Sequence, residues 1–314
     1  MIDEFYDEQG FVVTEKINDY AVNNPSQIAH ISEERYTQQI RSACQSISEN
    51  LSRSHIVLLA GPSASGKTIT AHRFRTMLKQ EFQINSLVVS LDDFYINQEL
   101  LPTLPDGSKD LETVYALDIE CIHRCFAELI GTNHTCLPVF DFLNARRADA
   151  CNEITLGEND ILIVEGIHAL NPIITEGMDR ERFFRLFISV QGEYRLNGDV
   201  ILDHTVIRFI RRCVRDYTHR ASTLENTASM WTSVRVGEKK YISPYKHYAD
   251  FIIDSLILYE PCVLLQFLRP LIETMDFTSE HYPRFEKIRD VLGYFAQMSP
   301  DCVATDSLLR EFID

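Results

Sequence analysis

The chain has 314 residues, of which 45% are hydrophobic and 24% charged, and its formal net charge at pH 7 is −16. This composition is typical of a folded globular protein, and the acidic balance argues against nucleic acid as the main partner. No apolar run approaches the ~20 residues that a membrane-spanning helix needs, and the acidic N-terminus does not resemble a signal peptide. We therefore expect a cytoplasmic protein without a membrane segment.

The first 54 residues are expected to lie outside the main domain. Residues 1–20 are acidic and weakly patterned, which predicts a loose extension or a small docking piece. Residues 26–52 carry apolar side chains at helical spacing, which predicts a helix that packs on the core.

Residues 56–68 carry the most specific motif of the chain. The apolar run 56–60 predicts a buried strand, and the residues after it fit the pattern Gly, four residues, Gly-Lys-Thr. In such a loop the backbone N–H groups point at phosphate oxygens, the lysine reaches the β- and γ-phosphates, and the threonine ligates Mg²⁺. The sequence therefore predicts a nucleoside triphosphate site formed by Gly61, Pro62, Ser63, Ala64, Ser65, Gly66, Lys67 and Thr68.

Two further apolar runs end in acidic residues. Residues 86–91 lead into Asp92 and Asp93, and residues 160–164 lead into Glu165. Ligands collect at the carboxyl ends of strands in open parallel sheets, so these carboxylates are well placed for chemistry. The alternatives are a capping or turn role for the aspartates and a solvent-facing glutamate. Because these residues accompany a phosphate-binding loop (P-loop), we favour a functional role for the carboxylates, in which Glu165 holds Mg²⁺ directly or through water.

The stretch between these runs predicts parts of a substrate site. Residues 99–114 form a polar connection long enough to cover a substrate. A helix is expected over 117–130, followed by an extended piece over 137–142 with aromatic residues at alternate positions. These aromatics could line a planar ligand, although buried strand aromatics without a ligand are commoner.

A basic helix is predicted over residues 207–219. One side of it carries Arg208, Arg211, Arg212 and Arg215, and the other side is apolar. Like charges at this spacing repel unless an anion offsets them, and a triphosphate is an obvious anion. A solvated basic face, partly paired with nearby acidic residues, is the alternative.

The eight cysteines follow no regular frame, which predicts reduced thiols. Between 121 and 136 three of them occur with two histidines, a composition that could bind zinc. The pattern around Cys121 and Cys125 is that of an amphipathic helix carrying small apolar thiols, and we favour this interpretation.

With further apolar runs at 185–190 and 249–254, strands alternate with helices along the chain. This order predicts the P-loop NTPase fold, a doubly wound parallel sheet with helices on both faces. We expect an N-terminal extension and packing helix over 1–54 and a P-loop kinase domain over 55–268, with an arginine lid near 207–240. A helical C-terminal segment is expected over 269–314. The guanine-reading Asn-Lys-x-Asp motif of GTPases is absent, so we expect a small-molecule kinase.

Several motifs together resemble the uridine kinase family, within the phosphoribulokinase/uridine kinase group. They are Gly-Pro-Ser-Ala-Ser-Gly-Lys-Thr, Ser-Leu-Asp-Asp-Phe-Tyr, Val-Phe-Asp-Phe, Val-Glu-Gly-Ile-His-Ala-Leu and Arg-Arg-Cys-Val-Arg-Asp. The chain is most similar to a bacterial uridine-kinase-like nucleoside kinase branch. That branch has similar stretches at 24–25, 231–238 and 308–313, and the resemblance is strong over about 55–268.

The resemblance implies an ATP- and Mg²⁺-dependent kinase that phosphorylates the 5′-hydroxyl of a nucleoside. Asp92 matches the catalytic base, and Glu112 the acid that holds the ribose hydroxyls. The other matches are Phe140 and Phe142 for base stacking, Glu165 for Mg²⁺, and Arg212, Arg215 and Arg220 for the lid. We also place Lys67 among the catalytic residues, Arg220 at the ATP, and Tyr95 and Arg147 at the substrate.

Two positions depart from the family pattern. The base-contacting histidine is replaced by Ala145, which leaves the base preference open, and the Arg-Gly of the lid is Arg220-Ala221, a change that could stiffen the lid. Other acceptors, such as a sugar phosphate or pantothenate, are an alternative, as is an inactive nucleotide-binding regulator. The inactive regulator is disfavoured because the chain retains the residues expected for catalysis, Lys67, Thr68, Asp92 and Glu165. The sequence leaves open whether the chain forms a homo-oligomer.

Overall fold

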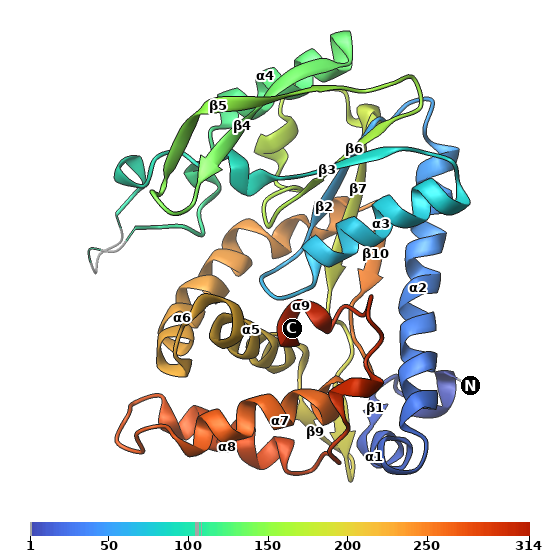
Figure 1. Ribbon diagram of the computed structural model, residues 1–314, viewed down its shortest axis with the longest axis vertical. Coiled ribbons are helices and arrows are strands. Elements are labelled where there is room, and N and C mark those ends of the chain that lie inside the picture. Colours follow the sequence, from blue (N-terminus) through green and yellow to red (C-terminus); the bar gives the residue numbers. More distant parts are fainter. Residues whose placement is uncertain (1, 104–106, 108) are drawn as a thin grey trace.

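A five-stranded parallel sheet forms the centre of the computed structural model (Figure 1), which describes residues 2–103, 107 and 109–314. In chain order its strands are β2 (Ile56–Ala60), β3 (Ser86–Ser90), β6 (Ile161–Glu165), β7 (Phe183–Ser189) and β10 (Phe251–Asp254). Their order across the sheet is β10-β7-β2-β6-β3, and every neighbouring pair is parallel. The five strands predicted from the apolar runs are confirmed, with the P-loop strand in the middle.

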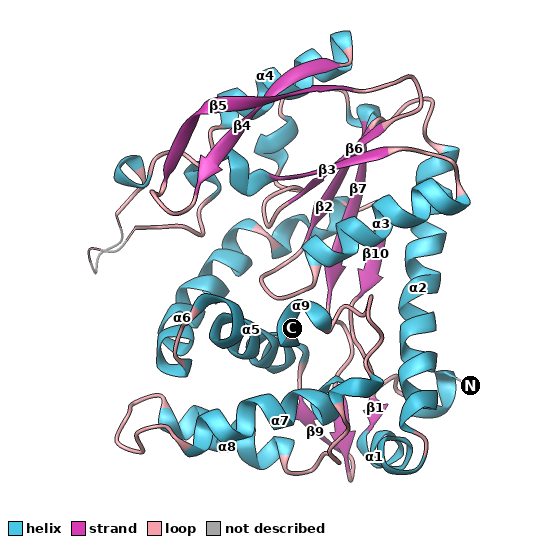
Figure 2. Cartoon of the chain, viewed as in Figure 1, coloured by secondary structure: helices cyan, strands magenta, loops and turns pink. Residues whose placement is uncertain are grey.

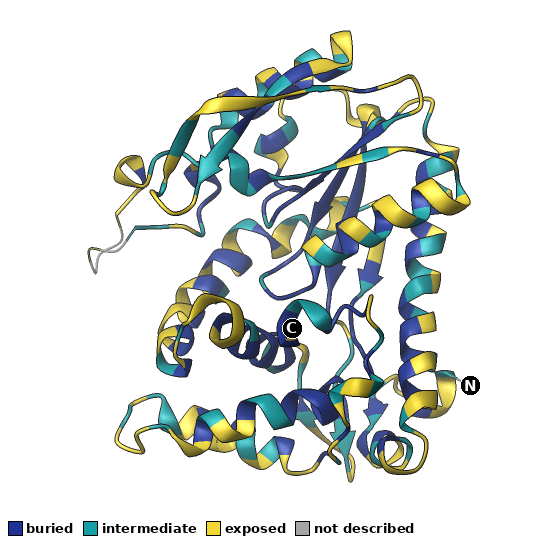
Figure 3. Cartoon of the chain, in the orientation of Figure 1, coloured by how far each residue is buried: buried dark blue, intermediate teal, exposed yellow. Residues whose placement is uncertain are grey.

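Both faces of the sheet are buried. Along β2, Val57 and Leu59 join one hydrophobic core, whereas Ile56 and Leu58 join a second one. Alternate side chains of a strand point to opposite faces, so helices must cover both sides. Figure 3 shows the resulting buried strands at the centre of the molecule. The doubly wound arrangement is therefore confirmed.

The helices divide between these two cores. α2 (Pro25–Glu49) and α3 (Lys67–Glu81) contribute to the first core, and α4 (Ile119–Thr132) contributes to the second. The remaining helices are α1 (Thr14–Asn23), α5 (His204–Arg220), α6 (Leu224–Tyr241), α7 (Glu260–Glu273), α8 (Tyr282–Leu292) and α9 (Arg310–Ile313). None of the helices in the described part of the chain is both long and apolar enough to cross a membrane.

The N-terminal residues are not a loose extension. Phe5, Val12 and Ile17 are fully buried in the first core. The short strand β1 (Val12–Val13) pairs with β8 (Tyr194–Leu196), which in turn pairs with β9 (Asp199–Leu202). Of the two alternatives predicted for residues 1–20, the loose extension was wrong, because widely spaced apolar residues gave little periodicity although they are buried, and the small docking piece fits the structure.

A long antiparallel hairpin lies apart from the central sheet, next to α4 (Figure 2). Its strands are β4 (His134–Asp141) and β5 (Arg146–Thr155). The predicted extended piece corresponds to β4, whereas β5 was not predicted, since its residues are mostly polar and exposed. Part of the connection predicted to cover a substrate, residues 104–106 and 108, lies outside the described residues.

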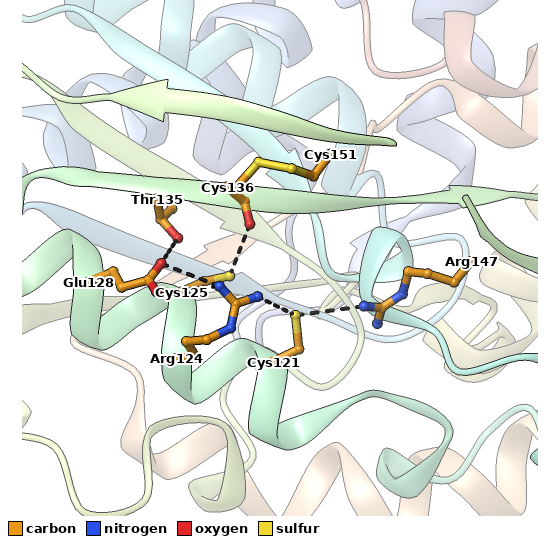
Figure 4. The surroundings of a disulfide bond; sticks show 8 residues. All are labelled: Cys121, Arg124, Cys125, Glu128, Thr135, Cys136, Arg147 and Cys151. Carbon is orange, nitrogen blue, oxygen red and sulfur yellow. Dashed lines mark hydrogen bonds and ion pairs between the residues drawn. A yellow bond between two sulfur atoms is a disulfide. The ribbon is translucent and has the colours of Figure 1, made fainter. Parts of the chain in front are cut away.

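A disulfide between Cys136 and Cys151 ties the two strands of this hairpin together (Figure 4). The prediction that all cysteines are reduced thiols is therefore wrong for this pair, because the hairpin pairing that brings them together was not foreseen. Within the described ranges, no group of three or more His, Cys, Asp or Glu residues could hold a metal ion.

The helix beneath the hairpin carries two free thiols. Cys125 donates to the carbonyl oxygen of Cys136 at 3.6 Å, and Arg124 and Arg147 donate to the sulfur of Cys121 (Figure 4). Hydrogen bonding from Cys125 and from the two arginines lowers the pKa of Cys121 to about 6. These contacts fix the hairpin on α4.

Candidate active site

The P-loop turns between the end of β2 and the start of α3. A Cβ atom on Gly61 would lie 2.2 Å from the carbonyl oxygen of Ile188, so no other residue fits there. Gly66 has a φ of +89°, a left-handed conformation that glycine adopts readily. The Lys67 ammonium donates to the carbonyl oxygen of Pro62 at 3.3 Å and so lies back over the loop. The two glycines thus permit the tight turn that the motif predicts.

Two of the arginines expected to face an anion are buried ion pairs instead. The Arg208 guanidinium donates to both carboxylate oxygens of Glu238, at 2.9 and 2.8 Å. Arg211 does the same with Glu260, at 2.6 and 2.8 Å. The side chains of Arg208 and Arg211 are 1% and 0% exposed. The prediction for these two residues was wrong because their partners come from α6 and α7, far along the chain.

The same two arginines also support the P-loop from behind. Arg208 donates to the carbonyl oxygen of Ser63 at 3.2 Å, and Arg211 donates to that of Ala64 at 3.4 Å. A buried carbonyl group needs a hydrogen-bond donor, and here α5 supplies two. Helix α5 therefore helps to fix the shape of the loop.

The other arginines of α5 gather around one buried carboxylate. Asp216, whose side chain is 2% exposed, accepts from Arg212 at 3.1 Å and from Arg215 at 2.9 Å, and lies 3.5 Å from Arg220. Arg212 also donates to the hydroxyl of Ser63 at 2.8 Å. One carboxylate thus pairs with three guanidinium groups beside the P-loop, so the cluster carries a net positive charge.

The charge of the P-loop lysine acts on three carboxyl groups. Asp92 follows β3, Glu165 ends β6, and these two strands are parallel neighbours, with Ser90 paired opposite Glu165. Glu112, in the long connection, lies within electrostatic range of Asp92 and Lys67. Burial raises the pKa of all three carboxyl groups, and the positive charge of Lys67 opposes the rise in each.

This charge balance fits a divalent cation. Thr68 donates to a Glu165 carboxylate oxygen at 3.2 Å, so the two expected Mg²⁺ ligands are in contact. Burial also lowers the pKa of Lys67, although part of this residue remains accessible to solvent. Oxygen ligands beside buried, incompletely neutralised carboxylates are the donor set that Mg²⁺ prefers.

The aromatic residues predicted for the acceptor lie together. Ring centroids are 5.8 Å apart for Tyr95 and Phe140 and 5.1 Å apart for Phe140 and Phe142, and both pairs are edge-to-face. Phe142 remains 63% exposed. The phenol of Tyr95 lies within electrostatic range of Asp92 and Glu112. The hairpin thus presents an aromatic surface next to the carboxylates.

Arg147 is held by the protein itself. Its guanidinium donates to the carbonyl oxygen of Phe94 and to the carboxylate of Asp118, both at 3.3 Å. Its backbone N–H donates to the side chain of Asn97 at 2.8 Å. These hydrogen bonds connect β5 to the segment after Asp92, so Arg147 has a structural function. Its contact with a substrate stays a prediction.

Both departures from the family pattern have a left-handed backbone. Ala145 has a φ of +50° at the tip of the hairpin, and Ala221 has a φ of +48° at the end of α5. The methyl group of Ala145 offers no hydrogen bond to a base. Glycine adopts this conformation more readily than alanine, which gives a physical reason for the glycine of the family at position 221.

One buried residue of the site was missed by sequence analysis. His168 is 2% exposed, and burial lowers its pKa to about 4, so its ring is neutral at pH 7. Neither ring nitrogen meets a well-aligned hydrogen-bond partner among the described residues. Its ring lies 6.0 Å from that of Tyr241, and its environment is influenced by the charge of Lys67. The sequence signal for it was its position in the Val-Glu-Gly-Ile-His-Ala-Leu motif, three residues after Glu165.

The chain is similar to known proteins of one family. The family model described as "Phosphoribulokinase / Uridine kinase family" matches residues 56–259. A uridine kinase of Macrococcus caseolyticus is 28% identical over 207 residues, which cover 65% of this chain and 90% of that protein. A uridine kinase of Borrelia hermsii is 29% identical, covering 69% and 95%.

Solved structures of similar fold are more distant. The phosphoribulokinase of Rhodobacter spheroides has a TM-score of 0.45 and 16% identity, covering 66% of this chain and 74% of that one. The family model spans well over half of the chain and includes the P-loop, Asp92, Glu165 and α5. The chain belongs to the phosphoribulokinase/uridine kinase family.

Proposed function

We propose that this P-loop kinase, which transfers a phosphoryl group from ATP to an alcohol, acts on a nucleoside and forms its 5′-monophosphate. The observation that carries the proposal is that Lys67, Asp92 and Glu112 are partly buried and that their charges act on one another. An edge-to-face cluster of aromatic rings lies beside them. Carboxylates suit ribose hydroxyls, and aromatic rings suit a planar base.

In this mechanism Asp92 accepts the proton of the 5′-hydroxyl as the oxygen attacks the γ-phosphorus. The bond between the γ-phosphorus and the bridging oxygen of ADP breaks, and the charge that develops is met by Lys67, Arg212 and Arg215. Thr68 and Glu165 would hold Mg²⁺, which neutralises charge on the phosphate oxygens. Glu112 orients the ribose, and Arg220 closes over the phosphates.

The geometry supports these assignments in two ways. The carboxyl group of Asp92 is partly buried and lies within electrostatic range of Lys67 and Arg220, which supports its assignment as the base. Its carboxyl group also lies near Glu112, as the environment of Glu112 shows. We also propose that the chain is divided into an N-terminal part over 1–54, a kinase domain over 55–268 and a C-terminal part over 269–314. We propose a cytoplasmic location for the protein.

The test is the release of ADP from Mg-ATP with a panel of pyrimidine and purine nucleosides, a sugar phosphate and pantothenate. Acceleration by a nucleoside, lost in Asp92→Asn, supports the proposal. Acceleration only by a non-nucleoside alcohol would overturn the acceptor assignment while keeping the kinase. A flat panel with intact Mg-ATP binding would indicate an inactive regulator.

A further inference from the structure

The last residues of the chain contact the P-loop directly. A Cβ atom on Gly66 would lie 2.4 Å from Cδ1 of Leu308, and the three heavy atoms nearest to that Cβ all belong to Leu308. Leu308 is 0% exposed. In Figure 1 the C-terminal helix α9 lies beside the turn that joins β2 to α3. A residue 242 positions further along the chain than Gly66 therefore packs against the phosphate-binding turn.

Two further contacts fix this segment in place. The ring of Phe312 lies 5.3 Å from the guanidinium of Arg211, which itself donates to the P-loop carbonyl of Ala64. The hydroxyl of Ser307 donates to Glu33, which also accepts from Tyr259 at 3.0 Å. The segment 307–313 thus contacts α2 through a hydrogen bond, α5 through a cation–π interaction and the P-loop through packing.

Glu311 brings a negative charge to the same place. Its Oε2 atom is buried, and no hydrogen-bond donor among the described residues reaches it. Its charge acts on the Lys67 ammonium and on the Arg211 guanidinium. A buried carboxylate oxygen without a hydrogen-bond donor is incompletely neutralised, so its charge also acts on the lysine of the phosphate-binding loop.

We propose that the C-terminal segment 307–314 is part of the nucleotide site, in which Leu308 holds the P-loop in its binding conformation and the carboxylate of Glu311 limits the affinity for phosphates. The inference rests on the proposed function only in taking ATP as the ligand of the P-loop. Leu308 and Glu311 are positioning residues with opposite effects on ATP affinity. Because like charges repel, Glu311 also favours release of the product ADP, which limits turnover in many kinases.

The Leu308 contact is tested by comparing Leu308→Ala with Leu309→Ala in the full chain. Both leucines are 0% exposed and lie in the same core, so both variants lose the same side-chain volume and a similar amount of stability. We expect calorimetric titration with Mg-ADP to show affinity weakened about tenfold or more in Leu308→Ala only. Equal weakening in both variants would mean a general stability effect and would overturn the inference.

The Glu311 charge is tested by Glu311→Gln, which removes no volume, with Asp314→Asn as the matched control. Asp314 is an exposed carboxylate of the same segment that pairs with Arg310. We expect Glu311→Gln to bind Mg-ATP and Mg-ADP about three- to tenfold more tightly and to turn over more slowly, and Asp314→Asn to behave as wild type. Unchanged or weaker binding in Glu311→Gln would overturn the assignment, even if the leucine variants fail to fold.

These results separate the inference from the proposed function. Wild-type protein that does not bind Mg-ATP or Mg-ADP would contradict the donor assignment itself. Wild-type protein that binds both, with all four variants alike, would leave the kinase in place and reject the function of the C-terminal segment.

Discussion

The side chain of Glu112 packs directly against the backbone of Gly237, since a Cβ atom on Gly237 would lie 2.5 Å from the Cβ atom of Glu112. Gly237 lies in α6, one residue before Glu238, the buried partner of Arg208. The carboxylate proposed to hold the ribose is therefore positioned by the same helix that anchors the arginine behind the P-loop.

This contact predicts a specific effect of Gly237→Ala. The added methyl group must push Glu112 away, so we expect the KM for the nucleoside to rise about tenfold while the KM for ATP changes little. The control is Gly131→Ala in α4, where a Cβ atom would meet nothing within 4 Å and alanine favours the helix. Wild-type kinetics in Gly237→Ala, or an equal change in Gly131→Ala, would contradict the positioning of Glu112.

Replacement of the proposed base should separate chemistry from binding. In Asp92→Asn the amide cannot accept the proton of the hydroxyl, so kcat should fall about 10²- to 10⁴-fold while Mg-ATP still binds. The measurement is steady-state turnover together with calorimetric titration of Mg-ATP. Asp93→Asn, which alters the neighbouring half-buried carboxylate, should retain most of the activity. A comparable loss in both variants would argue against Asp92 as the base.

The acid limb of the pH–rate profile should report Asp92. Burial raises the pKa of its carboxyl group above the usual 3.8, Asp93 raises it further, and Lys67 and Arg220 oppose the rise. The base works only when ionised, so the rate should fall as the pH drops through this raised pKa. Asp93→Asn removes a negative neighbour and should move the limb to lower pH. A limb that stays in place would assign it to another group.

Asp216 should stabilise the protein chiefly when no nucleotide is bound. Asp216→Asn leaves Arg212, Arg215 and Arg220 without their common carboxylate, so we expect a loss of about 3 kcal/mol in the free energy of unfolding. A bound triphosphate supplies the missing anion, so Mg-ATP should raise Tm more in the variant than in wild type. Thermal unfolding with and without Mg-ATP measures both effects. Equal shifts would mean that the triphosphate does not meet these arginines.

The hairpin disulfide can be tested by counting thiols. The chain has eight cysteines, so the protein denatured without reductant should show six reactive thiols, and eight after reduction. The bond closes a loop with a sequence separation of 15, for which chain entropy predicts about 3 kcal/mol of stabilisation. The double variant Cys136→Ser/Cys151→Ser should therefore unfold at a lower Tm. Eight thiols without reductant would show that the pair is reduced in solution.

Local patterns in the sequence were sufficient to predict the strands and the turn that carry the site. The apolar runs before Gly61, Asp92 and Glu165 predicted three strands, and parallel strands necessarily bring their carboxyl ends to one edge of the sheet. The glycine spacing of the P-loop was equally informative, because a tight phosphate-binding turn depends on a few consecutive residues. The fold and the placement of the main candidate residues could be predicted for this reason.

Contacts between distant parts of the chain were decided only by the tertiary structure. Arg211 belongs to a regular basic stripe, and nothing in that stripe indicates that Glu260 neutralises it. Residues 308–313 were noted in the sequence only as a stretch shared with the family branch, yet Leu308 packs against the P-loop and the charge of Glu311 acts on Lys67. Periodicity identifies which side chains are buried, but the partner of each is set by the packing of helices against both faces of the sheet.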